Sequence, residues 1–352
     1  MKLNPFKNQI GLDISDFKIR FIQFQLKKKH KYELNSLGEV SVPAGIIKNG
    51  EIIDEKAVSD LIKSILIRPT SGRINTKFVN ASLPEKKIFI KTISIPKVPE
   101  NEIDGAVSWG IEQNIPVTID QVNYDWQIIE KSNNDPSKMD VLVAVAPKTL
   151  VDTYTRVIQN SGLILIGLEN ESIAIARCLL DQQINKNYST MIIDLGRSRT
   201  NITVYANASI QLNATLDING TEMTKQISKT LKLSENDAEK AKIICGLDKR
   251  KAKAQIFTIL EPIIIRLANK ITEYLSYYNN YFPNSQKIKS IILTGSASSM
   301  VGLTDYLKNF LNNDVKIGDP QINLISTKKE IKHDLLSFTT AIGLAIKDFN
   351  DI

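Results

Sequence analysis

Residues 191–205 read MIIDLGRSRTNITVY: an apolar run, an aspartate, a small polar turn and a second apolar run. Residues 10–24, IGLDISDFKIRFIQF, repeat this order. Each pattern predicts two antiparallel strands joined by a tight turn. When Asp13 is aligned with Asp194, the apolar residues on either side also align, and further strands follow both hairpins in the same order. Internal repetition of this kind predicts a duplicated α/β fold with two lobes.

Composition limits the class of protein. The chain has 352 residues, of which 42% are hydrophobic, and a net charge of +7. This length is typical of about two domains, each able to bury a core. The positive charge suits an acidic partner, an anionic lipid or a polyphosphate, and it is equally typical of a soluble protein with none of these. The two cysteines, Cys178 and Cys245, have no spacing that predicts a disulfide or a zinc site, which favours a reducing compartment.

The sequence predicts neither nucleic-acid binding nor a membrane-spanning segment. Residues 249–253 form a basic run too short to indicate nucleic-acid binding. The first residues, MKLNPFKNQIGLD, lack the apolar region of a signal peptide, and no apolar run approaches the roughly 18 residues of a membrane span. We therefore expect no transmembrane segment, so any function at a membrane would be that of a peripheral protein.

The two hairpin turns suit a phosphate ligand. A tight turn directs successive backbone N–H groups into one concavity, and small residues such as Ser15, Gly196 and Ser198 let the backbone approach closely. The aspartates, Asp13 and Asp194, can hold Mg²⁺ through water, because this cation keeps several waters when it bridges carboxylates and phosphates. Two such turns facing one another would bind a triphosphate from both sides.

Two further features are weaker candidates. In residues 291–299, IILTGSASS, a strand runs into Gly295 and a helix start is expected to follow, which would place free N–H groups beside a ligand. The stretch has neither the GxGxxG nor the P-loop pattern, and a strand that ends in a glycine turn is common in α/β proteins without a ligand there. Glu169 and Glu171 can position water near a phosphate, although a role at a helix start is equally compatible with them.

Taken in order, these motifs resemble the actin-like ATPase superfamily. Residues 11–24 and 193–205 are similar to its two phosphate loops, and residues 292–307 to its adenosine loop. Within the superfamily the chain resembles the PilM family of cytoplasmic type IV pilus assembly proteins. That likeness rests on residues 95–129, similar to the family's inserted subdomain, and on residues 218–242. The matches run from about residue 9 to residue 348, nearly the whole chain.

The resemblance implies a two-lobed fold with a duplicated RNase H-like α/β core and an inserted α+β subdomain in the first lobe. The first lobe would span 1–187, with its core at 1–80 and 160–187, the insertion at about 81–159, and a C-terminal helix at 335–352 that completes it. The second would span 188–334, with its core at 188–218 and 287–334 and a helical subdomain at about 219–286.

The resemblance also implies ATP and Mg²⁺ in a cleft between the lobes. The expected nucleotide-binding residues are Asp13, Ser15, Arg20, Asp194, Gly196, Ser198, Thr200, Gly220, Glu239, Lys242, Gly295, Ser296 and Ala297. Asp13 and Asp194 would hold Mg²⁺ through water, and Glu171 is the weak catalytic candidate.

Several residues depart from the family's pattern. Asp16 stands where a small hydroxyl residue is common and would repel a phosphate, and Arg20 replaces a lysine, which changes a point charge into a planar fork. Asn219 and Ser296 each replace a usual glycine and are expected to restrict turns that favour positive φ. We therefore predict an ATP-binding protein with weak or no ATPase activity.

The family's function implies a scaffold at the inner face of the inner membrane. It would bind the cytoplasmic tail of the membrane protein PilN in a groove beside the inserted subdomain and link the alignment complex to the pilus motor ATPases. Nucleotide-dependent lobe closure and self-association into rings are further expectations. The alternatives are a cell-division protein like FtsA, which should end in an amphipathic membrane helix, and a small-molecule kinase, which needs an acceptor pocket.

Overall fold

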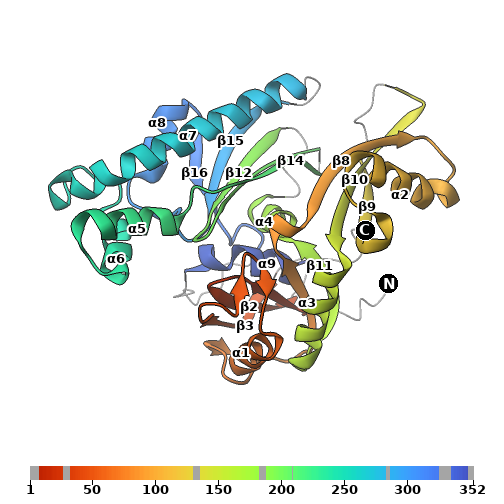
Figure 1. Ribbon diagram of the computed structural model, residues 1–352, viewed down its shortest axis with the longest axis horizontal. Helices are drawn as coiled ribbons and strands as arrows, with labels where there is room; N and C mark the ends of the chain where they lie inside the picture. The colour runs from red at the N-terminus through yellow and green to blue at the C-terminus, as the bar shows by residue number, and fades with distance from the viewer. Residues whose placement is uncertain are drawn as a thin grey trace. The chain divides into compact units, whose positions relative to one another are not determined.

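The computed structural model of the chain forms two compact units. It describes residues 8–26, 32–129, 135–181, 188–207, 209–282, 286–324 and 334–347 (Figure 1). Met1–Asp181 and Pro320–Ile352 make up unit 1, and Gln182–Asp319 makes up unit 2. The domain boundaries expected from the sequence stay a prediction. Residues 182–187, at the expected boundary between the lobes, and residues 348–352 of the expected C-terminal helix lie outside the described residues.

Unit 1 is built around a six-stranded mixed sheet in the order β11-β7-β1-β2-β3-β6. Its strands are β1 (Ile10–Ile14), β2 (Lys18–Leu26), β3 (Tyr32–Ser41), β6 (Ser71–Gly72), β7 (Phe78–Leu83) and β11 (Ile164–Asn170). The short strands β4 (Ile47–Lys48) and β5 (Glu51–Ile52) form a separate hairpin. The central strand β1 is buried along its whole length, which explains why its residues other than Asp13 are apolar or glycine.

Helices cover both faces of this sheet. The helices are α1 (Glu55–Ile67), α3 (Lys148–Asn160), α4 (Glu171–Leu179) and α9 (Thr339–Ala345). Ile10, Leu12 and Ile14 share one apolar cluster with residues of α1 and α3. On the opposite face, a Cβ added to Gly11 would lie 1.9 Å from the carbonyl oxygen of Ala341, so only glycine lets α9 pack this closely on β1. The C-terminal helix therefore belongs to the core of unit 1.

A small α+β subdomain is inserted between β7 and α3. Its three strands, β8 (Phe89–Pro96), β9 (Val122–Ile129) and β10 (Lys138–Pro147), form an antiparallel sheet in the order β8-β10-β9. Helix α2 (Ile103–Asn114) packs on one face through Ile103, Val107 and Ile111. The helix follows Pro99 by way of a short 3-10 turn, η2 (Glu100–Glu102), and is capped at its C-terminal end by Ile115.

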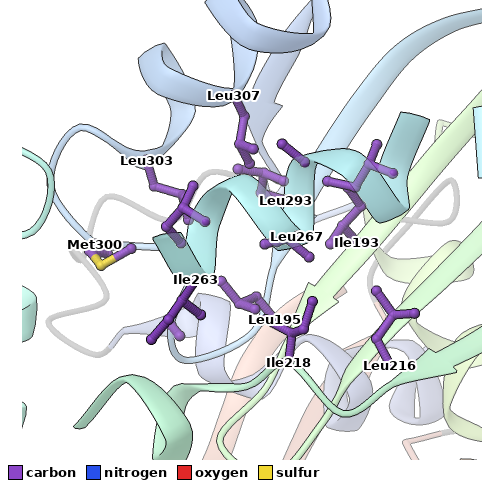
Figure 2. Packing of buried hydrophobic residues seen from close by; sticks show 14 of the residues in the cluster. Ile193, Leu195, Leu216, Ile218, Ile263, Leu267, Leu293, Met300, Leu303 and Leu307 are labelled. Atoms are coloured by element: carbon purple, nitrogen blue, oxygen red, sulfur yellow. The ribbon is translucent and has the colours of Figure 1, made fainter. Parts of the chain in front are cut away.

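Unit 2 contains a five-stranded sheet in the order β14-β13-β12-β15-β16. Its strands are β12 (Ser189–Leu195), β13 (Thr200–Ala206), β14 (Ser209–Leu216), β15 (Ile288–Thr294) and β16 (Val315–Ile317), and its helices are α5 (Gly220–Leu231), α6 (Glu235–Cys245), α7 (Gln255–Tyr281) and α8 (Leu303–Leu311). Figure 2 shows Ile263 and Leu267 of α7 packed near Ile193, Leu195 and Leu293 of the sheet, in one buried cluster.

The strand orders of the two units confirm the duplication. In unit 1, β1 pairs antiparallel with β2 and parallel with β7. In unit 2, β12 pairs antiparallel with β13 and parallel with β15. Beyond these, β3 and β14 extend the antiparallel side, and β11 and β16 extend the parallel side. Asp13 and Asp194 each occupy the next-to-last position of the central strand.

Candidate functional site

In unit 1, Asp13 is held at the end of β1 by the neighbouring parallel strand. Its side chain is buried and accepts a hydrogen bond from the Ser82 hydroxyl at 3.1 Å. The same Ser82 oxygen accepts the backbone N–H of Ile14 at 3.3 Å. The carboxylate is thus positioned through β7, because the last residues of β1 and β7 come close together in a parallel pair. Ser82 was not foreseen from the sequence, since it lies far from Asp13 along the chain.

The turn that follows is closed by Ser15. Its backbone N–H donates to the carbonyl oxygen of Lys18 at 3.1 Å, and its hydroxyl donates to the same oxygen at 2.8 Å. The next residue, Asp16, accepts hydrogen bonds from the backbone N–H groups of Asn49 and Gly50 at 3.0 and 2.7 Å. Both carboxylate oxygens of Asp16 therefore bind the β4–β5 turn, which gives this departure from the family pattern a structural role.

Arg20, opposite Asp13 in the hairpin register, is paired with Glu39. Its Nε lies 3.1 Å from Glu39 Oε2, and its guanidinium lies 5.7 Å from the centre of the Phe338 ring. Lys18 also forms an ion pair with Glu39. Burial would raise the pKa of Glu39, but the hydrogen bonds and charges of Lys18 and Arg20 outweigh it and hold the pKa below its ordinary value. Arg20 is thus bound within unit 1 by an acid from β3.

The two glutamates near α4 have different surroundings. Glu169 is buried and forms a bidentate ion pair with Arg177, with distances of 2.6 and 2.7 Å, while Lys347 lies 3.3 Å away. Burial would raise its pKa, but these two cations outweigh burial and lower it. Glu171 is the first residue of α4 and is also buried, next to Asn170, whose side chain caps the helix. Glu169 therefore has a structural role, and the catalytic role of Glu171 stays a prediction.

In unit 2, the second turn brings Asp194 against Gly295. The two strands pair in parallel, so that Asp194 of β12 lies beside Thr294 at the end of β15. A Cβ added to Gly295 would lie 2.3 Å from Asp194 Oδ1, and its φ of +87° is one that side chains rarely adopt. Glycine is required at this position for both reasons.

The loop after Gly295 differs from the sequence expectation. A helix start was expected there, but α8 begins only at Leu303. Residues between them form hydrogen-bonded turns, in which Ala297 N–H donates to the carbonyl oxygen of Leu195 at 3.0 Å and the Ser298 hydroxyl donates to that of Gly295 at 2.7 Å. Ser296 is exposed in this loop. The loop is thus tied to the second turn by backbone hydrogen bonds.

The beginning of α5 joins the same cluster. Gly196 N–H donates to the carbonyl oxygen of Arg199 at 2.9 Å, closing the second turn, and Gly220 N–H donates to that of Gly196 at 3.0 Å. Thr200 donates its hydroxyl hydrogen to the carbonyl oxygen of Ile218, 2.5 Å away, which ties β13 to the segment before α5. Ser198 lies in the turn itself, between β12 and β13.

A buried lysine completes this arrangement. Lys242 Nζ lies 3.1 Å from the carbonyl oxygen of Gly220, 2.9 Å from the Thr224 hydroxyl and 2.7 Å from Glu239. Burial lowers the pKa of Lys242, and Glu239 offsets this only in part. Burial would raise the pKa of Glu239, but hydrogen bonds from Lys242 and Thr224 outweigh it and lower the pKa. Thr224 was not foreseen, although its position one helical turn after Gly220 is a signal for it.

For Asn219 and Ser296, two of the departures from the family's pattern, the backbone conformation differs from the expectation. Asn219 has φ −155° and ψ 170°, an extended conformation that any residue adopts. Its side chain caps α5 by accepting the Glu222 N–H at 3.0 Å. Ser296 is not among the residues with positive φ. The expectation that these residues restrict turns with positive φ is therefore wrong, because neither position uses such a conformation.

The expected site residues thus form two groups. Asp13, Ser15 and Arg20 gather around the β1–β2 turn of unit 1. In unit 2, a Cβ on Gly220 would lie 3.3 Å from Gly196 O and 3.4 Å from both Ala297 Cβ and Lys242 Nζ. The ten expected residues of unit 2 therefore lie in four places: the β12–β13 turn, the start of α5, the loop after β15, and helix α6. That both groups meet around one ligand stays a prediction.

Direct protein ligation of a metal has no candidate in the described residues. Among them, no group of three or more His, Cys, Asp or Glu side chains is placed to hold a metal ion. That Asp13 and Asp194 hold Mg²⁺ through water stays a prediction, for which one carboxylate and the phosphates of a ligand would suffice. Within the described part of the chain, no helix is long and apolar enough to cross a membrane.

Comparison with known proteins identifies the family. The family model described as type IV pilus assembly protein PilM matches residues 11–349. The chain belongs to the PilM family. The chain is also similar to the curated cell-division protein FtsA, with 23% identity to the protein of Neisseria meningitidis over 95% of this chain and 88% of that one. The FtsA of Streptococcus pneumoniae is 19% identical over 97% of this chain and 84% of that one.

Solved structures show that this PilM-family member has the actin-like ATPase fold. A chain of a PilM–PilN type IV pilus biogenesis complex matches with a TM-score of 0.81 and 20% identity, covering 97% of this chain and 98% of that one. The ethanolamine utilization protein EutJ of Carboxydothermus hydrogenoformans has a TM-score of 0.57 and 14% identity, with 97% and 90% covered. MreB5 of Spiroplasma citri, bound to ADP, has a TM-score of 0.54 and 13% identity, with 95% and 94% covered.

Proposed function

We propose that this protein is an ATP-binding scaffold of type IV pilus assembly that binds the cytoplasmic tail of a PilN-like inner-membrane protein. The observation that carries the proposal is the family match over residues 11–349. The fold supports it, because the chain is similar along nearly its whole length to a protein in a PilM–PilN complex. In this proposal the protein works at the inner face of the inner membrane, links the alignment complex to the pilus motor ATPases and assembles into rings.

The nucleotide part of the proposal is supported by the arrangement in unit 2. Three backbone segments, which begin at Gly196, Gly220 and Gly295, meet at the ends of β12 and β15. The ends of parallel strands and the first turn of a helix offer N–H groups that suit phosphate oxygens. Lys242 and Glu239 lie beside Gly220 and provide charged groups for the sugar and the base. A Mg²⁺ ion bound through water to Asp13 and Asp194 would neutralise the phosphates.

Weak or absent hydrolysis is proposed because the charged residues of the first turn have protein partners. Arg20 forms an ion pair with Glu39, and both carboxylate oxygens of Asp16 accept backbone hydrogen bonds. A guanidinium that must leave an ion pair loses that energy before it can stabilise a transition state. Glu171 is the residue that we assign to the positioning of water, should any hydrolysis be measured.

The scaffold role is tested by titrating the full-length protein with a synthetic peptide of the PilN-like tail from the same species. We expect saturable binding, and a scrambled peptide of equal composition is the control. Equal binding of both peptides, or of neither, would contradict the proposal. The groove beside the inserted subdomain, where we expect the tail, would be located by cross-linking from that peptide.

The nucleotide site is tested by binding of labelled ATP with Mg²⁺. We expect Asp13→Ala and Asp194→Ala to weaken binding, because each removes a carboxylate for the cation. Asp305→Ala is the matched control, since this aspartate is exposed on α8. If all variants bind as the original protein does, the assignment of the two turns is wrong, whereas the tail-binding result stands separately.

A further inference from the structure

The segment around α2 in the inserted subdomain is strongly acidic. Residues 99–126 contain six acidic residues and no Lys or Arg, in a chain whose net charge is +7. The acidic residues, Glu100, Glu102, Asp104, Glu112, Asp120 and Asp125, are all exposed. Within the described part of the chain none of them forms an ion pair with a lysine or arginine. Such a local reversal of charge favours a basic partner.

An exposed tryptophan lies in the middle of this acidic stretch. Trp109 is 60% exposed and makes no hydrogen bond or ring contact with the described residues. One helical turn before it, Gly105 faces open space, since a Cβ built there meets no atom within 4 Å. Because helical side chains lean toward the preceding turn, the indole is expected to lie over this bare stretch of backbone. An exposed Trp next to an open position is typical of an anchor residue in a protein interface.

Two of the carboxylates near Trp109 accept hydrogen bonds from neighbouring residues. Asp104 accepts hydrogen bonds from Tyr124 Oη at 3.2 Å and from Trp126 Nε1 at 3.1 Å, both on β9. Glu112, one turn after Trp109, accepts the Ile119 N–H at 3.2 Å. Both carboxylates can still bind a cation, because each is exposed and accepts only neutral donors. We call Glu102, Asp104, Trp109 and Glu112 the α2 face.

We propose that the α2 face binds an arginine-bearing basic segment of a partner protein. A guanidinium can stack on the indole of Trp109 and at the same time bind a neighbouring carboxylate with its fork of N–H groups. An apolar partner would leave the carboxylates desolvated and unpaired, and an anionic lipid surface would be repelled by them. This inference does not rest on the proposed function. Trp109 and Glu112 are exposed positions of α2, unlike Ile103, Val107 and Ile111, which are buried against the three-stranded sheet, and Asp104 lies at the edge of the face beside β9. None of the four residues is a predicted nucleotide-binding residue.

The test uses the full-length protein and fluorescein-labelled octaarginine, followed by fluorescence anisotropy at physiological ionic strength. We expect Trp109→Ala to raise the Kd roughly tenfold, and the double variant Glu102→Gln, Glu112→Gln to raise it at least as much. Tyr281→Ala and Glu273→Gln, which change an exposed aromatic and an exposed acid on α7, are the matched controls and should leave Kd unchanged. Thermal unfolding checks that each variant is folded.

Three outcomes would overturn the proposal. Equal binding by the original protein and Trp109→Ala would show that the indole does not contribute. Octalysine bound as tightly as octaarginine would show attraction by charge alone. Sedimentation velocity in which the original protein self-associates and Trp109→Ala is monomeric would assign the face to a second copy of this chain.

Discussion

At Gly295 one methyl group is expected to disturb the second turn. In Gly295→Ala the new Cβ would lie 2.3 Å from Asp194 Oδ1 and 2.7 Å from the carbonyl oxygen of Leu195, at a φ of +87°. Relief of these contacts must move the backbone, so we expect a loss of about 1–3 kcal/mol in the free energy of unfolding. ATP binding should weaken as well. Urea denaturation and binding of labelled ATP measure the two effects.

Gly105→Ala is the control for that substitution. This glycine lies in α2 and has nothing within 4 Å of its added Cβ. Alanine is the better helix former, so the variant should be as stable as the original protein or more stable by up to about 1 kcal/mol. If Gly295→Ala proves equally harmless, the close approach of Gly295 to Asp194 is not required.

Among the elements, α5 depends on the cap that Asn219 provides. Its side-chain oxygen accepts the Glu222 N–H at 3.0 Å, and the helix begins at Gly220, inside the candidate site. Asn219→Ala should cost about 1 kcal/mol of stability, whereas Asn219→Gly should cost only a few tenths. Chemical denaturation of both variants distinguishes them. A gain in stability from Gly would instead indicate that the asparagine strains the turn.

Glu169 joins three elements of unit 1. It belongs to β11 and pairs with Arg177 of α4, which also donates to the carbonyl oxygen of Gly343 in α9 at 2.9 Å, and with Lys347 after α9. Glu169→Gln leaves two cations without their acid, so we expect a loss of about 3–5 kcal/mol in the free energy of unfolding at neutral pH. Glu55→Gln, which breaks the exposed pair with Arg156, should cost little.

The same glutamate predicts a pH dependence. Its pKa in the folded protein lies below the ordinary 4.5, so its contribution to stability is present above pH 4.5 and is lost as the pH falls through the folded pKa. The difference in unfolding free energy between Glu169→Gln and the original protein should therefore shrink below pH 4.5. Urea titrations at several acidic pH values measure this. A constant difference would show that Glu169 is not charged in its pair.

Features of the elements that depend on local sequence pattern can be predicted, whereas contacts between residues far apart in the chain cannot. The hairpins, with their apolar strands and the aspartates Asp13 and Asp194, follow from local pattern, as does the order of strands around them. The partners of Arg20 and Glu169 lie on other strands and helices, so sequence pattern could not reveal them. Asn219 was misjudged because the φ of a residue in a turn depends on what its side chain binds.

For the whole molecule, the proposed scaffold needs communication between nucleotide and tail. In an actin-like fold, the two aspartate turns belong to different units, so a ligand that binds both turns favours the arrangement that brings them together. We expect ATP with Mg²⁺ to change the affinity for the PilN-like tail peptide by roughly tenfold, about 1.4 kcal/mol. Isothermal titration of the peptide with and without nucleotide measures this coupling.

Thermodynamic linkage between ATP binding and tail binding provides a second test of this coupling. If ATP changes the affinity for the tail by some factor, the tail must change the affinity for ATP by the same factor. Asp194→Ala should remove the coupling while the nucleotide-free protein still binds the peptide, because the aspartate lies in unit 2 and the inserted subdomain lies in unit 1. Equal tail affinities with and without ATP would exclude nucleotide control of the scaffold. A coupling that survives Asp194→Ala would instead place the nucleotide elsewhere.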